Sequence, residues 1–422
     1  MDRRVLFDAV FFDLDGTLVA TDRFWIGSAS RAARRAFLEL GLERALPTSA
    51  EWMSLVGKPL DQGFRELFPD LSPKQRRLVQ AACVREEERA LANGGAQAIP
   101  GARETLELLR AQGIKLGIAS NCSRSYLEHM LDSLGLRALV DAALCLESSG
   151  IESKADMVAR LLERFGTRSA VMVGDRAGDR DAAWRNGLPH VHCAFGFAPV
   201  DEPVVAEACI ESLGELRACL EGRSAWIEEL VTEIRAPARL AVTGGPSSGK
   251  TLLARDMARV LRASGRPAVA VSLEGFARTG GPSAWEHDPL ASLYDLERVQ
   301  AEVLGPHARG ERLTLRRPGL DGETSVPPGA ALVVEGPFLG DPRVRPGFER
   351  LFHLAIPAAL RERRWLGRAA GPGSERETWL SLHVEHERRF PPAEYASLVV
   401  DASNALGPPA GPARLNVKDH PE

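Results

Sequence analysis

The sequence contains no apolar run long enough to form a membrane-spanning helix. Such a helix needs ~20 consecutive apolar residues, and charged or turn-forming residues interrupt every apolar run of this chain before that length. No leader-like segment precedes Val5, where the first strand is expected to begin. These absences predict a cytoplasmic protein without a membrane partner.

Cysteine is scarce and shows no metal-ligand pattern. The six cysteines all precede residue 220, and none has the Cys-x-x-Cys or Cys/His spacing of a zinc site. We therefore expect free thiols in a reducing compartment.

A large charge of one sign is also missing. Lys and Arg number 53 against 57 Asp and Glu, which gives a formal net charge of -4. This balance argues against general nucleic-acid binding through charge alone and leaves open only a local basic cleft. At 422 residues the chain is long enough for two or three domains.

The first half of the chain is organised around the stretch FFDLDGTLV, residues 11–19. A mostly apolar run from Val5 to Phe12 has the length of a buried parallel strand, and Asp13 and Asp15 follow where it ends. Both carboxylates are therefore expected at the carboxyl end of a strand. Taken alone, an Asp-x-Asp-Gly sequence fits an ordinary turn equally well.

Later segments continue with alternating strand and helix patterns. The run KLGIAS ends at Ser120, and SAVMVGD ends at Asp175, with helical patterns between them. This alternation predicts a doubly wound parallel sheet whose candidate side chains lie at the carboxyl ends of strands, where such sheets bind ligands. Residues from about 20 to 98 show helical periodicity instead, which predicts a helical insertion after the first strand.

Four motifs in this order resemble the haloacid dehalogenase superfamily of phosphatases, in its phosphoglycolate phosphatase-like branch, over residues 1 to about 220. The matching residues are Asp13, Asp15, Gly16 and Thr17 in DLDGT, Ser120, Lys154 in ESKAD, and Asp175 and Asp179 in GDRAGD. The resemblance implies that the insertion is a cap closing over the active site. A closed cap favours a small phosphorylated substrate over a polymer.

The resemblance also implies catalytic roles. Asp13 would attack phosphorus and form an aspartyl-phosphate, while Asp15 would protonate the leaving oxygen and then activate water. Ser120 and Lys154 would bind the phosphoryl oxygens. The implied Mg²⁺ ligands are Asp13, Asp15, Asp175 and Asp179. The presence of Asp15 favours phosphoryl chemistry over carbon–halogen cleavage and leaves a phosphomutase open.

The second half is organised around GGPSSGKT, residues 244–251. This GxxxxGK[ST] spacing lies between an apolar strand pattern and a helical pattern, which is the context that a phosphate-binding P-loop requires. The loop from Gly244 to Gly249 would cradle nucleotide phosphates with its backbone N–H groups. Lys250 would reach the β- and γ-phosphate oxygens, and Thr251 would bind Mg²⁺. The motif predicts an ATP site.

Residues 224–403 resemble the uridine kinase and phosphoribulokinase-like branch of P-loop kinases, on the segments SLEGF, SLYDLERV, ALVVEGPFL and ALRERRWLGR. The resemblance implies that Glu274 is the base or helps to hold the metal, although relatives usually have Asp there. Glu335 would be the acid near the metal. Arg364 and Arg368, four residues apart on one helical face, would stabilise charge on the transferred phosphoryl group.

We therefore predict an α/β chain with two doubly wound parallel-sheet domains. The predicted boundaries are a Rossmann-like phosphatase core at 1–222 with its cap at about 20–98, a P-loop kinase at 223–405, and a disordered tail at 406–422. The predicted protein is a bifunctional Mg²⁺- and ATP-dependent enzyme. It would hydrolyse a small phosphomonoester and phosphorylate a small hydroxyl acceptor such as a nucleoside or sugar.

Two alternatives remain at this point. One is a polynucleotide kinase-phosphatase for end repair, against which the helical insertion and the lack of net basic charge count. The other is a nucleotide-binding regulatory protein with one inactive domain, because motifs alone do not establish activity. The sequence sets neither the substrates nor the oligomeric state.

Overall fold

The computed structural model describes residues 5–278, 293–316, 323–367, 373–403 and 406. These residues divide into two compact units, one ending at Glu221 and the other beginning at Gly222. The predicted lid residue Arg368 and the predicted tail, Leu406 excepted, lie outside the described residues. Among the helices that the structure describes, none is long and apolar enough to cross a membrane.

The first unit is built on a six-stranded parallel sheet in the order β3-β2-β1-β4-β5-β6. Its strands are β1 (Ala9–Phe12), β2 (Lys115–Ser120), β3 (Ala142–Cys145), β4 (Ala170–Gly174), β5 (His190–Cys193) and β6 (Ala208–Ile210). All four residues of β1 are buried, as expected for a central strand covered on both faces. The sheet changes direction of winding around β1, which is where such sheets place ligands.

Helices connect these strands. They are α5 (Ala102–Ala111), α6 (Arg124–Ser133), α7 (Lys154–Phe165) and α8 (Ala177–Arg185). Helix α9 (Gly214–Val231) follows β6, and the boundary between the two units, after Glu221, falls within it. The amino ends of α6 and α7 are capped by the hydroxyls of Ser123 and Ser153, which accept backbone N–H bonds. The polar sequence signals before each helix therefore fix where the loops above the sheet end.

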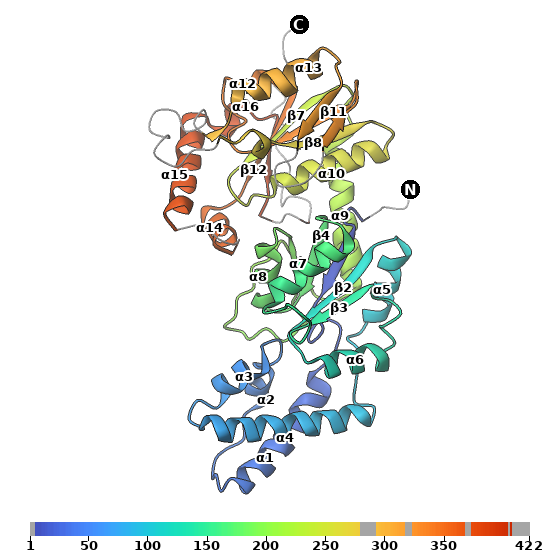
Figure 1. Cartoon of the computed structure of the whole chain (residues 1–422), viewed down its shortest axis with the longest axis vertical. Coiled ribbons are helices and arrows are strands. Elements are labelled where there is room, and N and C mark those ends of the chain that lie inside the picture. Colours follow the sequence, from blue (N-terminus) through green and yellow to red (C-terminus); the bar gives the residue numbers. More distant parts are fainter. Residues whose placement is uncertain (1–4, 279–292, 317–322, 368–372, 404–405, 407–422) are drawn as a thin grey trace. The chain divides into compact units, whose positions relative to one another are not determined.

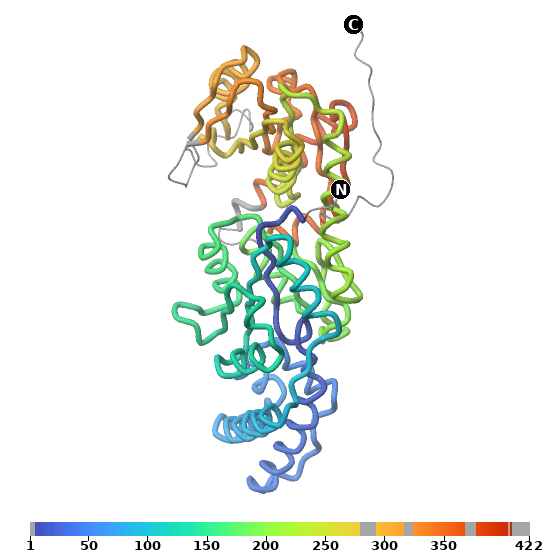
Figure 2. The backbone as a smooth tube through the Cα atoms, turned by 90° about the vertical axis from the view of Figure 1, so that its right-hand side faces the viewer, coloured from blue at the N-terminus to red at the C-terminus, as the bar shows by residue number. Residues whose placement is uncertain are grey.

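The predicted helical insertion is present between β1 and α5. It comprises α1 (Asp22–Glu39), α2 (Ser49–Met53), α3 (Leu60–Leu67) and α4 (Pro73–Ala92). Figure 1 shows α1 to α4 grouped together, and the same helices are blue in Figure 2. Their shared core is aromatic, because Trp52 packs against Trp25, Phe64 and Phe68 with ring centroids 6.0–6.4 Å apart. We call these four helices the cap.

The second unit contains a five-stranded parallel sheet in the order β13-β12-β7-β11-β8. Its strands are β7 (Arg239–Gly244), β8 (Ala268–Ser272), β11 (Ala331–Glu335), β12 (Arg350–Ala355) and β13 (Leu398–Asp401), and β9 (Leu313–Arg316) pairs antiparallel with β10 (Glu323–Val326). The predicted α/β class with two parallel sheets is confirmed. That the second sheet belongs to a kinase stays a prediction.

The remaining helical segments of this unit surround its sheet. They are α10 (Lys250–Ala263), η1 (Leu273–Phe276), α12 (Leu296–Val299), η3 (Gln300–Leu304), α13 (Gly305–Ala308), η4 (Arg345–Gly347), α14 (Ala358–Gly367), α15 (Gly373–Arg389) and α16 (Pro392–Tyr395). Helix α10 begins directly after the loop that leaves β7, as the P-loop motif requires.

Candidate phosphatase site and P-loop

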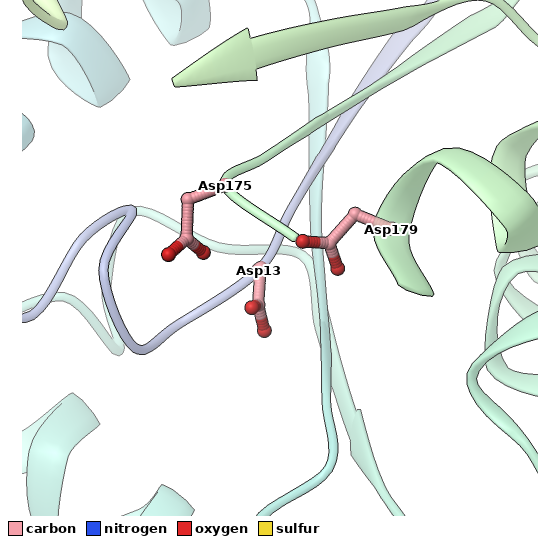
Figure 3. A group of neighbouring side chains, drawn as sticks. All are labelled: Asp13, Asp175 and Asp179. Atoms are coloured by element: carbon pink, nitrogen blue, oxygen red, sulfur yellow. The ribbon is translucent and has the colours of Figure 1, made fainter. Parts of the chain in front are cut away.

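Three buried aspartates meet at the carboxyl ends of adjacent strands in the first unit. Asp13 follows β1, Asp175 follows β4, and Asp179 lies in the first turn of α8. One carboxylate oxygen from each lies within 4.8 Å of the others. Figure 3 shows the three carboxylates around a common space. We call Asp13, Asp175 and Asp179 the acidic cluster.

Lys154 joins two members of this cluster. Its Nζ lies 2.8 Å from Asp13 Oδ1 and 2.7 Å from Asp179 Oδ1. The lysine is the first residue of α7, and all three side chains are buried. Asp13, Lys154 and Asp179 are far apart in the sequence but in direct contact in the structure. They meet because parallel strands bring their carboxyl ends to one edge of the sheet.

Neighbouring backbone groups fix the other carboxylates. Asp175 Oδ2 accepts a 2.6 Å bond from the N–H of Phe197, and Asp179 Oδ2 accepts a 2.9 Å bond from the N–H of Arg176. Gly16 has a φ of 76° and approaches Asp175 so closely that a Cβ there would lie 2.3 Å from Asp175 Oδ2. The glycine of the DLDGT motif is therefore required by both backbone conformation and space.

The cluster carries more negative than positive charge. Burial, reinforced by the nearby Asp179 charge and opposed by Lys154, raises the pKa of Asp13 to about 7. Burial and the charges of Asp13 and Asp179 also raise the pKa of Asp175. For Lys154, burial opposes the charge, but Asp13 and Asp179 outweigh it and raise its pKa. One lysine therefore leaves three buried carboxylates undercompensated.

This deficit fits a bound divalent cation. Among the described residues, Asp13 Oδ2 and Asp175 Oδ1 are buried without a hydrogen-bond partner. Buried carboxylate oxygens are normally paired or bound to a metal, and Mg²⁺ prefers oxygen ligands, often one or two carboxylates together with waters. The acidic cluster has the donor set for Mg²⁺.

Asp15 occupies a different position from the other acids. It is not part of the acidic cluster; its Oδ1 accepts a 2.5 Å bond from Thr21 Oγ1 and a 2.6 Å bond from Tyr126 Oη. The expectation that the Asp15 side chain helps to hold the metal is therefore not reproduced in the geometry. Burial raises the pKa of Asp15, and the bonds from Thr21 and Tyr126 lower it.

Sequence reasoning missed Thr21 and Tyr126. Thr21 lies six residues beyond Asp15 at the start of the cap, but Tyr126 is 111 residues away on α6. No spacing rule links a tyrosine to an acid across that separation, so only the tertiary structure brings them together. Ser120, the predicted phosphoryl ligand, is buried at the end of β2, the strand beside β1.

The cap loop around Lys58 contacts the sheet loops. Asn121 Nδ2 donates a 2.9 Å bond to the carbonyl of Gly57, and Arg176 Nη1 donates to the carbonyl of Val56. Lys58 itself pairs with Glu66 of α3 at 2.5 Å. The loop is therefore held next to Asn121, one residue beyond Ser120, although Lys58 makes its ion pair within the cap.

The predicted P-loop, residues 244–251, lies between a strand and a helix, which is the context that the motif requires. Gly244 ends β7, and Gly249 precedes α10 with a φ of 92°. Lys250 Nζ donates a 2.8 Å bond to the carbonyl of Gly245. Thr251 Oγ1 donates a 3.2 Å bond to Glu335 Oε1 at the end of β11. The hydroxyl and acid predicted to hold a metal are thus in contact.

A cavity lies beside this contact. It has a volume of about 340 Å³, and its polar lining includes Thr251, Glu335 and Glu274, the last from η1 after β8. Glu274 is exposed. Burial raises the pKa of the Tyr294 hydroxyl, and the charges of Glu274 and Glu335 add to this effect. The structure therefore brings the predicted Glu274 into the same space as Thr251 and Glu335.

The predicted lid arginine Arg364 has another role. It is buried, and its guanidinium donates to the carbonyls of Ala402 at 3.2 Å and Ser403 at 2.9 Å, which follow β13. These bonds tie α14 to the end of the sheet, and the part of Arg364 in a phosphoryl-binding lid stays a prediction. Arg361, one helical turn earlier, lies at the P-loop instead, because a Cβ on Gly245 would be 2.8 Å from Arg361 Cδ.

The fold and the acidic cluster define a class of α/β phosphoryl-transfer hydrolases, and comparisons with known proteins agree. The family model described as haloacid dehalogenase-like hydrolase matches residues 10–192. A phosphoglycolate phosphatase of Synechococcus elongatus is 30% identical over 49% of this chain and 92% of its own length. That of Agrobacterium fabrum is 27% identical over 47% and 86%. A ribulose-1,5-bisphosphate 5-phosphatase of Halopiger xanaduensis is 40% identical over 28% and 54%.

The chain therefore belongs to the haloacid dehalogenase-like hydrolases. Its N-terminal half is a phosphoglycolate phosphatase-like domain, as the four motifs predicted. The family match ends at residue 192 and does not extend to the P-loop.

Proposed function

We propose that the first unit hydrolyses small phosphomonoesters through an aspartyl-phosphate on Asp13. The observation that carries the proposal is the contact of Asp13 with Lys154 at 2.8 Å inside a buried acidic cluster. A phosphomonoester is anionic and repels a carboxylate nucleophile, so the attack requires cations beside it. Mg²⁺ held by Asp13, Asp175 and Asp179 would neutralise charge on the phosphoryl group.

The remaining residues of the site have separate tasks. Lys154 provides a fixed positive charge at the nucleophile. Ser120, at the end of β2, would bind a phosphoryl oxygen. Asp15 lies two residues after the nucleophile and is held by two hydroxyls, which suits a group that gives a proton to the leaving oxygen and later takes one from water. A phosphomutase would instead return the phosphoryl group from Asp13 to the substrate. Analysis of the products distinguishes the two reactions.

The substrate class follows from the cap and from the relatives. A helical cap over the site favours a small phosphorylated molecule, and the relatives include the phosphoglycolate phosphatases of Synechococcus elongatus and Agrobacterium fabrum. We therefore infer a small phosphorylated metabolite as substrate and consider oligonucleotide ends disfavoured.

The test is phosphate release from a panel of small phosphomonoesters by the full chain with Mg²⁺. Asp13→Asn should lower turnover by orders of magnitude, because the amide cannot act as the nucleophile. Asp181→Asn is the matched control, since the Asp181 side chain is 58% exposed and forms its ion pair with the neighbouring Arg180. If Asp13→Asn released phosphate at the rate of the control, the nucleophile assignment would be wrong.

For the second unit we propose ATP-dependent phosphorylation of a small hydroxyl acceptor. The observation that favours it is the contact of Thr251 with Glu335 at the mouth of a cavity that Glu274 also lines. In this proposal Mg²⁺ and ATP bind at the P-loop, the acceptor occupies the cavity, and Glu274 accepts the acceptor's proton or supports the metal. Arg361 replaces Arg364 as the arginine nearest to the phosphates.

The two proposals test each other with reciprocal variants. Lys250→Ala should remove ATP-dependent phosphorylation of a nucleoside and sugar panel while phosphate release stays at the wild-type rate. Asp13→Asn should do the reverse. Unchanged phosphorylation in Lys250→Ala would overturn the kinase proposal, and no phosphorylation in the wild type would favour a regulatory nucleotide-binding unit.

End repair is tested by substrate size. We expect kcat/KM at one salt concentration to be higher for monomeric phosphomonoesters and free nucleosides than for 3′-phosphorylated or 5′-hydroxyl oligonucleotides. An oligonucleotide end needs an open basic groove. A clear preference for oligonucleotides in both activities would replace the metabolic reading with end repair.

A further inference from the structure

We propose that Tyr126 is a positioning residue that holds Asp15 in the orientation needed for proton transfer to the leaving group. This inference rests on the proposed phosphatase function and adds a residue to it. Tyr126 lies on α6, outside the four motifs, and its hydroxyl donates a hydrogen bond to Asp15, 111 residues away in the sequence. Its task would be geometric, because it does not touch the acidic cluster.

The key observation is that two hydroxyls bond to the same carboxylate oxygen. Thr21 Oγ1 and Tyr126 Oη both donate to Asp15 Oδ1, at 2.5 Å and 2.6 Å. Within the described part of the chain, no donor is recorded for Asp15 Oδ2. Oδ1 is therefore the anchored oxygen, and Oδ2 is the oxygen available to exchange a proton with substrate.

The backbone and the ring of Tyr126 each have a further contact. Its backbone N–H donates a 3.3 Å bond to Ser123 Oγ at the start of α6. Its ring lies 6.5 Å from the ring of Phe24 on cap helix α1, centroid to centroid. Thr21 immediately precedes the same helix. Asp15 is thus hydrogen-bonded both to Tyr126, on a helix of the sheet domain, and to Thr21, at the start of the first cap helix.

The two hydrogen bonds restrict rotation of the Asp15 carboxylate. A carboxylate turns easily about its Cβ–Cγ bond, because torsions at sp² groups are broad. Two donors on one oxygen restrict that rotation and keep the other oxygen directed at the reacting group, and such positioning is worth large factors in proton transfer. Removing the Tyr126 hydroxyl leaves Thr21 as the single anchor, so Asp15 samples unproductive orientations.

The effect must depend on the leaving group. An alkyl alkoxide is strongly basic and needs a proton as the phosphorus–oxygen bond breaks, whereas a nitrophenolate leaves without one. The parameter kcat/KM reports the steps up to departure of the leaving group, while hydrolysis of the aspartyl-phosphate contributes only to kcat. A positioning role for Tyr126 therefore lowers kcat/KM for alkyl phosphates selectively.

The experiment compares wild type and Tyr126→Phe, in the full chain with Mg²⁺, on glycerol phosphate and p-nitrophenyl phosphate. Phenylalanine keeps the ring against Phe24 and removes only the hydroxyl. We expect kcat/KM for glycerol phosphate to fall by about 10- to 100-fold, which is part of the roughly 10²–10⁴-fold that general acid–base catalysis contributes. For p-nitrophenyl phosphate we expect a change of less than about threefold. Thr21→Val should show the same selectivity, and Thr21→Ser, which keeps a hydroxyl, should restore activity toward glycerol phosphate.

Two results would overturn the inference. An equal fall of kcat/KM for both substrates would mean that Tyr126 only supports the structure, and unchanged values for both would mean that its bond does not position Asp15. Failure of the proposed phosphatase function would give a different result, because Asp13→Asn would then retain turnover of both substrates. A thermal melt of each variant identifies loss of folding. If Tyr126→Phe does not fold, the comparison of Thr21→Val with Thr21→Ser tests whether a hydroxyl bonded to Asp15 Oδ1 is needed for selective turnover of glycerol phosphate.

Discussion

Replacement of Lys154 by methionine tests whether the buried charge balance of the first unit has been correctly described. Lys154 contacts Asp13 and Asp179 at 2.8 and 2.7 Å, and the three side chains are 6%, 1% and 0% exposed. Methionine preserves most of the side-chain volume but removes the only cation in contact with these two acids among the described residues. Two buried carboxylates are then left without their partner.

The expected cost follows from that burial. Removing one partner of a buried ion pair destabilises a protein by about 3–5 kcal/mol, because the remaining charge stays desolvated. For a unit of this size, 1 kcal/mol shifts Tm by roughly 2–4 °C, so we expect a Tm lower by roughly 6–20 °C at pH 8 without Mg²⁺. At pH 5.5 the loss should be smaller, since Asp13, with a pKa of about 7 even beside the lysine, takes up a proton.

The assay is calorimetry of the full chain, in which the two units can unfold separately. Leu106→Ala, a fully buried core position of α5, identifies the transition of the first unit. Lys58→Met is the matched lysine control, because Lys58 and Glu66 form a surface pair whose loss should cost at most about 1 kcal/mol. Added Mg²⁺ should raise the Tm of Lys154→Met more than that of wild type.

A Tm for Lys154→Met within about 3 °C of the wild-type value at pH 8 would refute this reasoning. It would mean that the acidic cluster is neutral or hydrated in the folded protein. A loss of equal size at pH 5.5 and pH 8 would point instead to poor packing of methionine, because a packing defect does not depend on the protonation of Asp13.

Two further outcomes are expected. Burial and the nearby Asp15 charge raise the pKa of Glu87 on α4 to about 8 from a usual 4.5; the folded state therefore holds its proton more tightly, and stability falls as pH rises between these values. Glu87→Gln should remove that fall, so in thermal melts its Tm should exceed that of wild type at pH 8.5 but not at pH 4. The control variant Glu88→Gln, at the exposed neighbouring position, should show no such dependence on pH. Gly196→Ala should lower kcat at least about tenfold, because the new Cβ would lie 2.2 Å from Asp175 Cβ and must displace it; activity and Tm equal to wild type would contradict this crowding.

The kinase-related arginines illustrate a limit of prediction from helical spacing. Arg364 and Arg368 lie four residues apart, and spacing alone places them on one face of a helix. Which surface that face meets depends on how α14 packs against the sheet, and the structure turns Arg364 to the carbonyls after β13. Arg361 reaches the P-loop because it lies one turn earlier on the same buried side.

The sequence alone determined where the reactive acids would lie. An apolar run that ends in Asp13, and another that ends in Asp175, predict two strands of a parallel sheet, and parallel strands deliver their carboxyl ends to one edge. The spacing of the P-loop fixed its place between β7 and α10 in the same way. These features are local, because each depends on a strand and the few residues that follow it.

Only the tertiary structure decided what each acid touches. Asp13 and Asp15 are two residues apart, yet one joins Lys154 and the acidic cluster while the other is bonded to Thr21 and Tyr126. Successive side chains leave a strand end in directions set by the local turn, and their partners come from helices distant in the chain. Packing therefore decides that Asp13 joins the acidic cluster while Asp15 binds the hydroxyls of Thr21 and Tyr126. No spacing in the sequence encodes this difference.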